Sequence, residues 1–448
     1  MKKEKVKKKQ STTRSIALGF ALIIFVGALL LTLPIATRTG EVDFIESLFT
    51  ATSATCVTGL VVADTYQNWS IFGQIVIITM IQLGGLGFMT VGVYISVLLK
   101  KKIGLQERES IHESVNTMET AGVVRLVKKI VQGTFIIEGI GAILLATRFI
   151  PRFGVRRGIY YSFFHSISAF CNAGFDLMGI EGEYSSLVAF EDDIIVNVVV
   201  MLLILIGGIG FIVWDDIQRN KWHFKKYLLH SKIVIVTTVI ITIVTTILFF
   251  VFEYNNTLRD MTLLEKMLGA AFSSVTPRTA GFNTVDTAAL SEAGKLLSMV
   301  LMFIGGSPGS TAGGAKTTTI VVLVCYAIAM VRSHEDINLF GRRLTADVVK
   351  KANAVVMINL VLSLIVAMII MAMQPLLSGT DVMFEVLSAI NTVGMTTGIT
   401  RELNVIARIL IMILMYCGRL GSLSFALVFA QKNTTDSVRQ PQEKIIVG

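Results

Sequence analysis

Apolar residues along the chain are gathered into long runs that alternate with short polar segments. Eight runs reach the roughly 20 residues that a helix needs to cross the hydrocarbon core of a bilayer. They cover residues 16–35, 72–99, 128–150, 194–214, 232–252, 296–330, 353–374 and 405–430. Within each consecutive pair lies a shorter apolar segment, at 44–57, 160–172, 264–277 or 381–392. These four are too short to cross, so the pattern predicts eight membrane-spanning helices and four re-entrant segments.

The four short segments resemble one another. They contain the fragments TCVTGL, CNAGFD, RTAGFN and NTVGMT, each with a glycine followed by a bulky apolar residue. These glycines are Gly59, Gly174, Gly281 and Gly394. They are 115, 107 and 113 positions apart, which indicates an internal repeat. A second landmark, GGLG, GGIG, GGSPG or GRLG, follows in each copy and begins at Gly84, Gly207, Gly305 or Gly418.

Two interpretations of these glycines compete. Small residues in membrane helices usually permit close helix packing, which explains any single glycine pair. It does not explain why a short apolar segment and a glycine precede every second span. Non-helical backbone at membrane depth is tolerated where it is buried or lines an aqueous cavity. Four such segments around one pseudo-fourfold axis predict a ring of backbone carbonyls that replaces the water around a potassium-sized cation.

Composition and charge agree with a membrane location. The 448 residues are 53% hydrophobic and 16% charged, with a mean hydropathy of +0.70, which excludes an ordinary soluble enzyme. The loops expected on one side hold 27 Lys and Arg residues against 11 on the other, so the positive-inside rule places both termini in the cytoplasm. The net charge of +9 therefore does not indicate nucleic-acid binding. The external loop 176–193 carries six acidic residues, whereas Arg152, Arg156 and Arg157 are an external exception.

The four fragments and the stretch GGSPGSTAGGAKTTT resemble the Trk/Ktr/HKT superfamily of potassium transporters, and most closely the bacterial Ktr membrane subunit. The resemblance covers about residues 15–430 and implies that the carbonyls of the four glycines bind potassium. The filter that it implies consists of Thr58, Gly59, Asn172, Ala173, Gly174, Thr279, Ala280, Gly281, Thr392, Val393 and Gly394. Glycine in all four segments is associated with potassium selection in that superfamily. No segment contains the TVGYG of potassium channels, so we expect looser discrimination against sodium.

The stretch 296–330 is too long for one ordinary span and contains six helix breakers, so a helix must break there. Either this is a simple Pro and Gly kink, or, as the resemblance implies, it is an intramembrane loop under the filter that gates the pore. The gate residues would be Gly305, Gly306, Ser307, Gly309, Ser310, Thr311, Gly313, Gly314 and Lys316. The likeness of this stretch to a phosphate-binding loop fails, because Ala315 separates the glycine from Lys316.

Arg419 is the other predicted gate residue. It stands where the first two repeats have Gly85 and Gly208, inside the last apolar run. An arginine at membrane depth costs roughly 2.5–3.5 kcal/mol or more unless it faces water or a partner. The last run contains no acid that would neutralise it, so we expect Arg419 to point inward. The resemblance implies that this arginine lies below the filter near the gate loop, and we expect it to contact the loop 305–317 and to oppose cation passage.

Four other kinds of polar residue receive plainer interpretations. Glu138 in the third run binds a coupling ion or is a hydrogen-bonded carboxyl between helices, and Glu253 is expected to be solvated. His165 has no second metal ligand at usable spacing and is expected to pack. The four cysteines have no metal-ligand spacing and are expected to be free thiols; they are Cys56, Cys171, Cys325 and Cys417.

The predicted fold class is an all-α integral membrane protein with four tandem span, pore-helix and span repeats, eight transmembrane helices in all, around a pseudo-fourfold pore. Its segments are a basic cytoplasmic N-terminus (1–14), repeat 1 (15–100), a cytoplasmic loop (101–127), repeat 2 (128–217), a cytoplasmic loop (218–231), repeat 3 (232–331) with a broken second span and an intramembrane loop (305–317), a cytoplasmic loop (332–351), repeat 4 (352–430) and a cytoplasmic tail (431–448).

The predicted function is potassium uptake across a bacterial plasma membrane, with no cofactor in this chain and with sodium as an activator or co-transported ion. The alternative is a secondary carrier for an organic solute, but such carriers use inverted repeats, whereas these copies run in one direction. No paired carboxylates or nucleophile arrangements indicate a membrane enzyme. The expected partners are membrane lipid, a second copy of the chain in a homodimer and a cytosolic nucleotide-binding regulatory ring, the last two implied by the resemblance; nucleic acid is not expected. The basic loops 100–129 and 215–232 and the tail 431–448 are the candidate docking surfaces.

Overall fold

The computed structural model describes residues 12–41, 43–87, 90–92, 94, 123–334, 336–421 and 443. Most of the predicted N-terminal segment 1–14, cytoplasmic loop 101–127 and tail 431–448 lies outside these residues. The ends of the predicted spans 72–99 and 405–430 also lie outside them in part. Helices make up nearly all regular structure in the described part of the chain.

Each of the four short apolar segments forms a helix. They are α2 (Phe44–Cys56), α8 (Val155–Phe170), α12 (Leu263–Val275) and α16 (Gly379–Ile390). Side chains cap two of them: at α2 the Asp43 carboxylate accepts from the N–H of Ile45, and at α12 Thr262 and Glu265 form a capping box. The last turns of α2 and α16 are buried, so these helices end inside the protein.

A long apolar helix precedes each of these short helices. The four are α1 (Thr12–Leu31), α7 (Val123–Phe153), α11 (Leu229–Glu253) and α15 (Ala346–Met373). Among the described residues, these four are the helices that are individually long and apolar enough to cross a membrane. The number of candidate spans rises to five if the bent pair in repeat 2 counts as one span. Much of their surface is apolar and exposed, as expected for helices that face lipid.

The second helices of the four repeats end or break at their second landmarks. They are α4 (Ile71–Leu86), α9 (Ile194–Gly208) followed by α10 (Phe211–Asn220), α13 (Glu292–Ile304) followed by α14 (Thr317–Val331), and α17 (Val405–Leu420). The predicted break in 296–330 is present between Ile304 and Thr317. The prediction of one continuous helix over 194–214 is wrong, because α9 and α10 meet at an angle of 95°.

Glycine explains where these helices stop. The next landmark glycine after each helix has a positive φ, of 79°, 102°, 65° or 84°, at Gly87, Gly210, Gly305 or Gly421. Backbone with these angles is readily adopted by glycine and cannot continue a right-handed helix. The second landmarks therefore end helices in all four repeats, not in the third alone.

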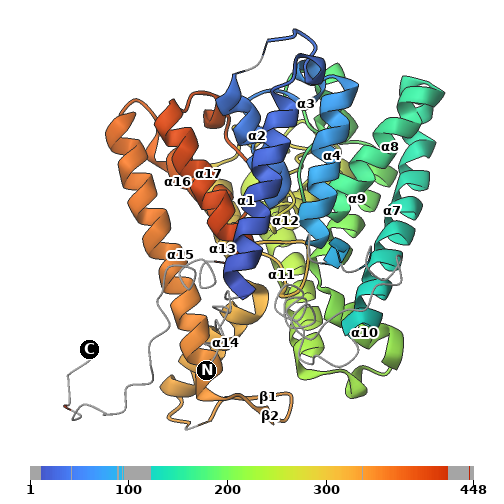
Figure 1. The fold of residues 1–448 in the computed structure, drawn as a ribbon. Helices are drawn as coiled ribbons and strands as arrows, with labels where there is room; N and C mark the ends of the chain where they lie inside the picture. Colours follow the sequence, from blue (N-terminus) through green and yellow to red (C-terminus); the bar gives the residue numbers. More distant parts are fainter. Residues whose placement is uncertain are drawn as a thin grey trace, which may run out of the picture.

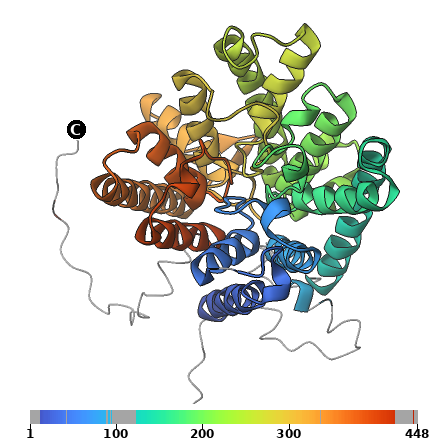
Figure 2. The same ribbon diagram turned by 90° about the horizontal axis from the view of Figure 1, so that it is seen from above.

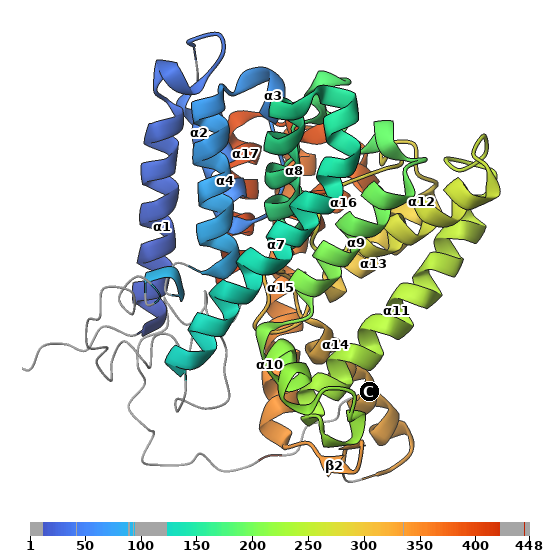
Figure 3. The ribbon, with the colours of Figure 1, turned by 90° about the vertical axis from the view of Figure 1, so that its right-hand side faces the viewer.

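The four groups of helices follow one another around the centre of the molecule in chain order (Figure 2). The ring closes where α17 packs beside α2, and the cluster of buried residues there joins repeats 1 and 4. The largest buried cluster joins repeats 1 and 2. In side view α11 and α12 lie on the far side of the molecule from α1, with α13 between (Figure 3).

Shorter elements lie at the two ends. At one end are α3 (Thr65–Asn68) and the turns η1 (Pro34–Ala36), η2 (Met178–Ile180), η3 (Val188–Phe190) and η5 (Ile399–Arg401). At the other end are η4 (Phe224–Lys226) and a hairpin whose strands are β1 (Asn338–Leu339) and β2 (Arg342–Arg343). The hairpin and α10 lie at the end where α1 and α15 begin (Figure 1).

Candidate ion filter and gate

The backbone after each short helix has the same unusual conformation. The residue two before each landmark glycine has φ between 49° and 72°; these residues are Val57, Asn172, Thr279 and Thr392. The glycines themselves have φ of 100°, 70°, 81° and 89°. Positive φ is strained for valine and threonine and acceptable for asparagine and glycine. Four copies of one strained conformation at equivalent positions indicate that the backbone there has a function.

The four glycines form a closed ring. A methyl group built on Gly59 would lie 2.6 Å from the carbonyl oxygen of Ala173, and one on Gly174 would lie 2.8 Å from that of Ala280. A methyl group on Gly281 would lie 2.7 Å from the carbonyl oxygen of Val393. One on Gly394 would overlap the carbonyl oxygen of Thr58, which returns the ring to repeat 1.

This ring leaves no room for a side chain. Each glycine faces the carbonyl that precedes the next glycine in the ring, so even alanine would force the backbone apart. The predicted filter loops of all four repeats are therefore brought together in one ring. Carbonyl rings of this kind bind dehydrated monovalent cations.

Hydroxyl groups hold the filter loops in place. The Ser53 Oγ accepts from the N–H of Gly59 at 3.0 Å, and the Ser388 Oγ accepts from the N–H of Gly394 at the same distance. The Ser168 Oγ donates to the carbonyl of Phe175 at 2.6 Å. All three serines lie six residues before a landmark glycine. Sequence analysis missed them, although their common offset was visible in three of the four short apolar segments.

Close packing explains three of the second landmarks. Methyl groups built on Gly84, Gly207 and Gly418 would collide with the carbonyls of Thr55, Phe170 and Ile390, respectively. These carbonyls belong to the residues four before the filter glycines of repeats 1, 2 and 4. The packing interpretation is therefore correct for these glycines. Their close packing also supports the ring, because each second helix contacts the end of the short helix in its own repeat.

The predicted gate loop 305–317 connects α13 to α14 and is attached to the break in repeat 2. The N–H of Ser307 donates to the carbonyl of Gly208 at 3.0 Å, and the N–H of Thr311 to that of Gly207 at 3.3 Å. In return the N–H of Phe211 donates to the carbonyl of Gly309 at 2.8 Å. These backbone bonds explain why α9 stops where it does.

The opposite side of the loop passes under repeat 4. A methyl group on Gly313 would overlap the hydroxyl of Thr392, and Gly314 packs against Asn391. The loop is closed on itself by the Ser310 Oγ, which donates to the carbonyl of Ser307 at 2.6 Å, and by a contact of 3.0 Å between the Ser307 and Thr317 hydroxyls. It therefore lies against filter loops on two sides.

Arg419 and Lys316 place two positive charges beside this loop. The predicted contact is present: Nη1 of Arg419 donates to the carbonyl of Thr311, and Nη2 donates to those of Gly84 and Gly85. Lys316 donates from Nζ to the carbonyls of Ala312 and Gly313 at 2.6 and 3.2 Å. Within the described residues Arg419 has no acidic partner, so its charge is satisfied by carbonyls alone.

The comparisons with known proteins agree with this geometry. Residues 3–440 match the family described as cation transport protein, TrkH. The chain is 41% identical to the potassium/sodium uptake protein NtpJ of Enterococcus hirae, over 100% of this chain and 99% of that protein. It is 40% identical to the Ktr system potassium uptake protein B of Bacillus subtilis, over 97% and 96% of the two chains.

The chain belongs to the TrkH family of cation transport proteins. The fold agrees: the crystal structure of the potassium transporter TrkH from Vibrio parahaemolyticus superposes with a TM-score of 0.73 at 18% identity, over 95% of this chain and 87% of that one. Membership in the family makes this a multi-pass membrane protein of a potassium and sodium uptake group and not an enzyme, as the sequence predicts.

In this TrkH-family chain a cavity of about 140 Å³ opens above the ring, and all four filter glycines line it. Three aspartates line this cavity: Asp64, Asp176 and Asp286. Arg401 also lines it and lies over the ring of Tyr184. Burial and the nearby Asp64 raise the pKa of Asp176 to about 7. Asp64 itself accepts backbone N–H bonds from three residues.

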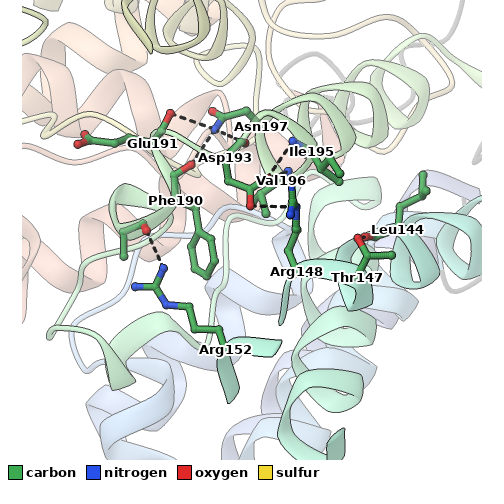
Figure 4. A network of polar contacts seen from close by, with 11 residues as sticks. Leu144, Thr147, Arg148, Arg152, Phe190, Glu191, Asp193, Ile195, Val196 and Asn197 are labelled. Carbon is green, nitrogen blue, oxygen red and sulfur yellow. Dashed lines mark hydrogen bonds and ion pairs between the residues drawn. The ribbon is translucent and has the colours of Figure 1, made fainter. Parts of the chain in front are cut away.

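Ion pairs account for part of the external arginine exception. Arg152 pairs with Glu181 at 2.9 Å. Figure 4 shows Arg152 beside the ring of Phe190, and the neighbouring Arg148 paired with Asp193 at 3.2 Å. Asp193 also caps α9, by accepting from the N–H groups of Ile195 and Val196. Two of the six acidic residues in 176–193 thus serve the structure, and fewer are free to attract cations than the sequence count indicates.

Of the other residues singled out in the sequence, one lies in surroundings that differ from the prediction. His165 is buried and packs against Phe149, as predicted. The prediction that Glu253 is solvated is wrong: it is 2% exposed and accepts from Asn256, Thr257 and Ser291, because α11 ends beside the start of α13. Glu138 is also buried and accepts from the amide of Gln82 at 3.2 Å, which agrees with the interhelical carboxyl interpretation. The four cysteines are free.

Proposed function

We propose that this chain takes up potassium through the ring of Gly59, Gly174, Gly281 and Gly394. The observation that carries the proposal is the closure of the ring by glycine and carbonyl contacts from all four repeats. Carbonyls replace the water of a dehydrated cation without adding net charge that would trap it. The short helices α2, α8, α12 and α16 end near the ring, and their dipoles favour a cation there.

The loop 305–317 and Arg419 form the gate in this proposal. The loop lies against the filter loops of repeats 2 and 4, and Arg419 fastens it to α4 of repeat 1. A fixed positive charge on the cation path raises the energy of a passing ion. Uptake requires the loop to leave this position.

The proposed arrangement in the membrane has eight crossings, one by each long helix and one by each interrupted second helix. The end that carries the hairpin and α10 faces the cytoplasm of a bacterial cell, together with both termini. Support comes from the basic residues of that end, among them Lys225, Lys226, Arg342 and Arg343.

The regulatory partner in this proposal is a separate cytosolic ring that binds nucleotide. Relatives bear the name Ktr system potassium uptake protein, which describes a component of a system. The basic cytoplasmic loops are the proposed docking surface, and a homodimer in the lipid bilayer is the proposed assembly. Sodium acts as an activator or as a co-transported ion, in keeping with the potassium/sodium name of another relative.

The test is rubidium and potassium flux into liposomes that contain the purified chain, with and without sodium. Gly281→Ser adds a side chain inside the ring, whereas Gly40→Ser adds one at a similar φ of 79° with nothing within 4 Å. We expect potassium-selective flux that loses selectivity in Gly281→Ser and keeps it in Gly40→Ser. No flux from the folded chain, even after the cytosolic ring is added, would refute potassium uptake and favour the organic-solute carrier.

A further inference from the structure

One side chain connects the gate loop to the filter. Asn172 is 1% exposed and lies two residues before Gly174, with a φ of 59°. Its Oδ1 accepts from the hydroxyl of Thr311 at 3.0 Å, and its Nδ2 lies 3.5 Å from the hydroxyl of Thr279. Thr311 belongs to the gate loop and Thr279 to the filter loop of repeat 3. The two ends of one amide thus contact both parts of the proposed pore.

Every polar atom of Thr311 has a hydrogen-bond partner in this position. Its hydroxyl contacts Asn172 and, at 3.2 Å, the carbonyl of Phe170. Its N–H donates to the carbonyl of Gly207, and its carbonyl accepts from Arg419. It is 1% exposed, so water does not replace these partners while the loop stays in position. Movement of the loop must break all of these bonds together.

The equivalent positions in the other repeats lack this connection. Val57 is apolar, and the hydroxyl of Thr392 has no hydrogen-bond partner among the described residues. Asn172 is also enclosed: a methyl group on Gly207 would lie 2.9 Å from its Oδ1, and one on Gly208 would lie 3.5 Å from its Nδ2. The amide is therefore enclosed beside α9, with its Oδ1 toward Thr311 of the loop and its Nδ2 toward Thr279.

From this geometry we propose that Asn172 couples the gate to the filter, so that the position of the loop 305–317 sets how well the ring distinguishes potassium from sodium. When the loop leaves, the Oδ1 of Asn172 loses its donor inside the protein. The amide then turns toward another donor, and the contact between the filter loops of repeats 2 and 3 loosens. This inference rests on the proposed function and assigns Asn172 as a positioning residue.

The test is a double-mutant cycle on flux and selectivity in liposomes. Thr311→Val removes the gate-side hydroxyl and Thr279→Val removes the filter-side hydroxyl, with little change of shape in either case. Loss of one hydrogen bond is expected to raise potassium flux in Thr311→Val roughly 3- to 10-fold. The same variant should lower the potassium to sodium flux ratio. In a Thr279→Val background, Thr311→Val should still raise flux but should change the ratio no further.

Ser310→Ala is the matched control, because the Ser310 hydroxyl bonds within the gate loop and does not contact the filter. It is expected to leave the flux ratio unchanged. A Thr311→Val variant that raises flux with an unchanged ratio would overturn the coupling while leaving the potassium pore intact. Strictly additive effects of the two threonine substitutions on the ratio would also overturn it. Absence of selective flux in the unmodified chain would instead count against the proposed function.

Discussion

Arg419 gives the most direct test of the proposed gate. Its guanidinium joins the carbonyl of Thr311 in the loop to those of Gly84 and Gly85 on α4. A hydrogen bond to a charged group contributes about 1.5–3 kcal/mol. Arg419→Gln removes the charge and the bridge, so the loop should leave the pore roughly 10- to 150-fold more often. The rate of rubidium uptake per protein in liposomes should therefore increase.

Two further variants separate charge from geometry. Arg419→Lys keeps the positive charge, but a single ammonium lacks the fork that reaches both the loop and α4. If the bridge holds the loop, the lysine variant should be nearly as active as Arg419→Gln; if charge alone opposes cations, it should resemble the unmodified chain. Arg408→Gln, on the same helix α17 near the outer end, is the control and should have little effect. An unchanged rate in a folded Arg419→Gln protein would refute the reasoning for both mechanisms.

Two predictions concern carboxylates. The pKa of Asp176 is raised to about 7, so its negative charge appears at the proposed pore entrance as the external pH rises through 7. Uptake at low potassium should therefore increase up to about fivefold between pH 6 and 8. The Asp176→Asn variant should lose this pH dependence. In Glu253→Gln, an amide N–H₂ would face donors from Asn256 or Ser291, so the free energy of unfolding should fall by about 2–3 kcal/mol. A thermal unfolding scan in detergent measures this, and an unchanged Tm would contradict the role given to that carboxylate.

The sequence predicted the parts of this protein that depend on local pattern. A helix lies in each short apolar segment, because apolar runs between capping residues and glycine specify helix ends locally. The break after Ile304 was predictable because six breakers gather there. The grouping of the four glycines was predictable once their spacing was recognised as a repeat.

Features that depend on tertiary contacts were not predictable. The landmark GGIG predicts that a helix ends in repeat 2, but not the direction of α10, which is bent away from α9 where Phe211 and Gly208 bond to the loop 305–317. Glu253 looks like a residue at a wet helix end, yet the start of α13 covers it. The connection from Asn172 to Thr311 spans 139 positions, and no periodicity records it.

The closed ring has a consequence for how such a pore can change. In a pore built from four identical chains, a substitution alters every quarter at once, and any gate must be present four times. Here one chain supplies all four quarters, so Val57, Asn172, Thr279 and Thr392 differ while the glycines beside them stay alike. Repeat 3 carries the loop 305–317, and the turn between α9 and α10 in repeat 2 shares backbone hydrogen bonds with it. One chain of four unlike repeats can thus keep the symmetry of its glycine ring while the side chains and loops around the ring differ.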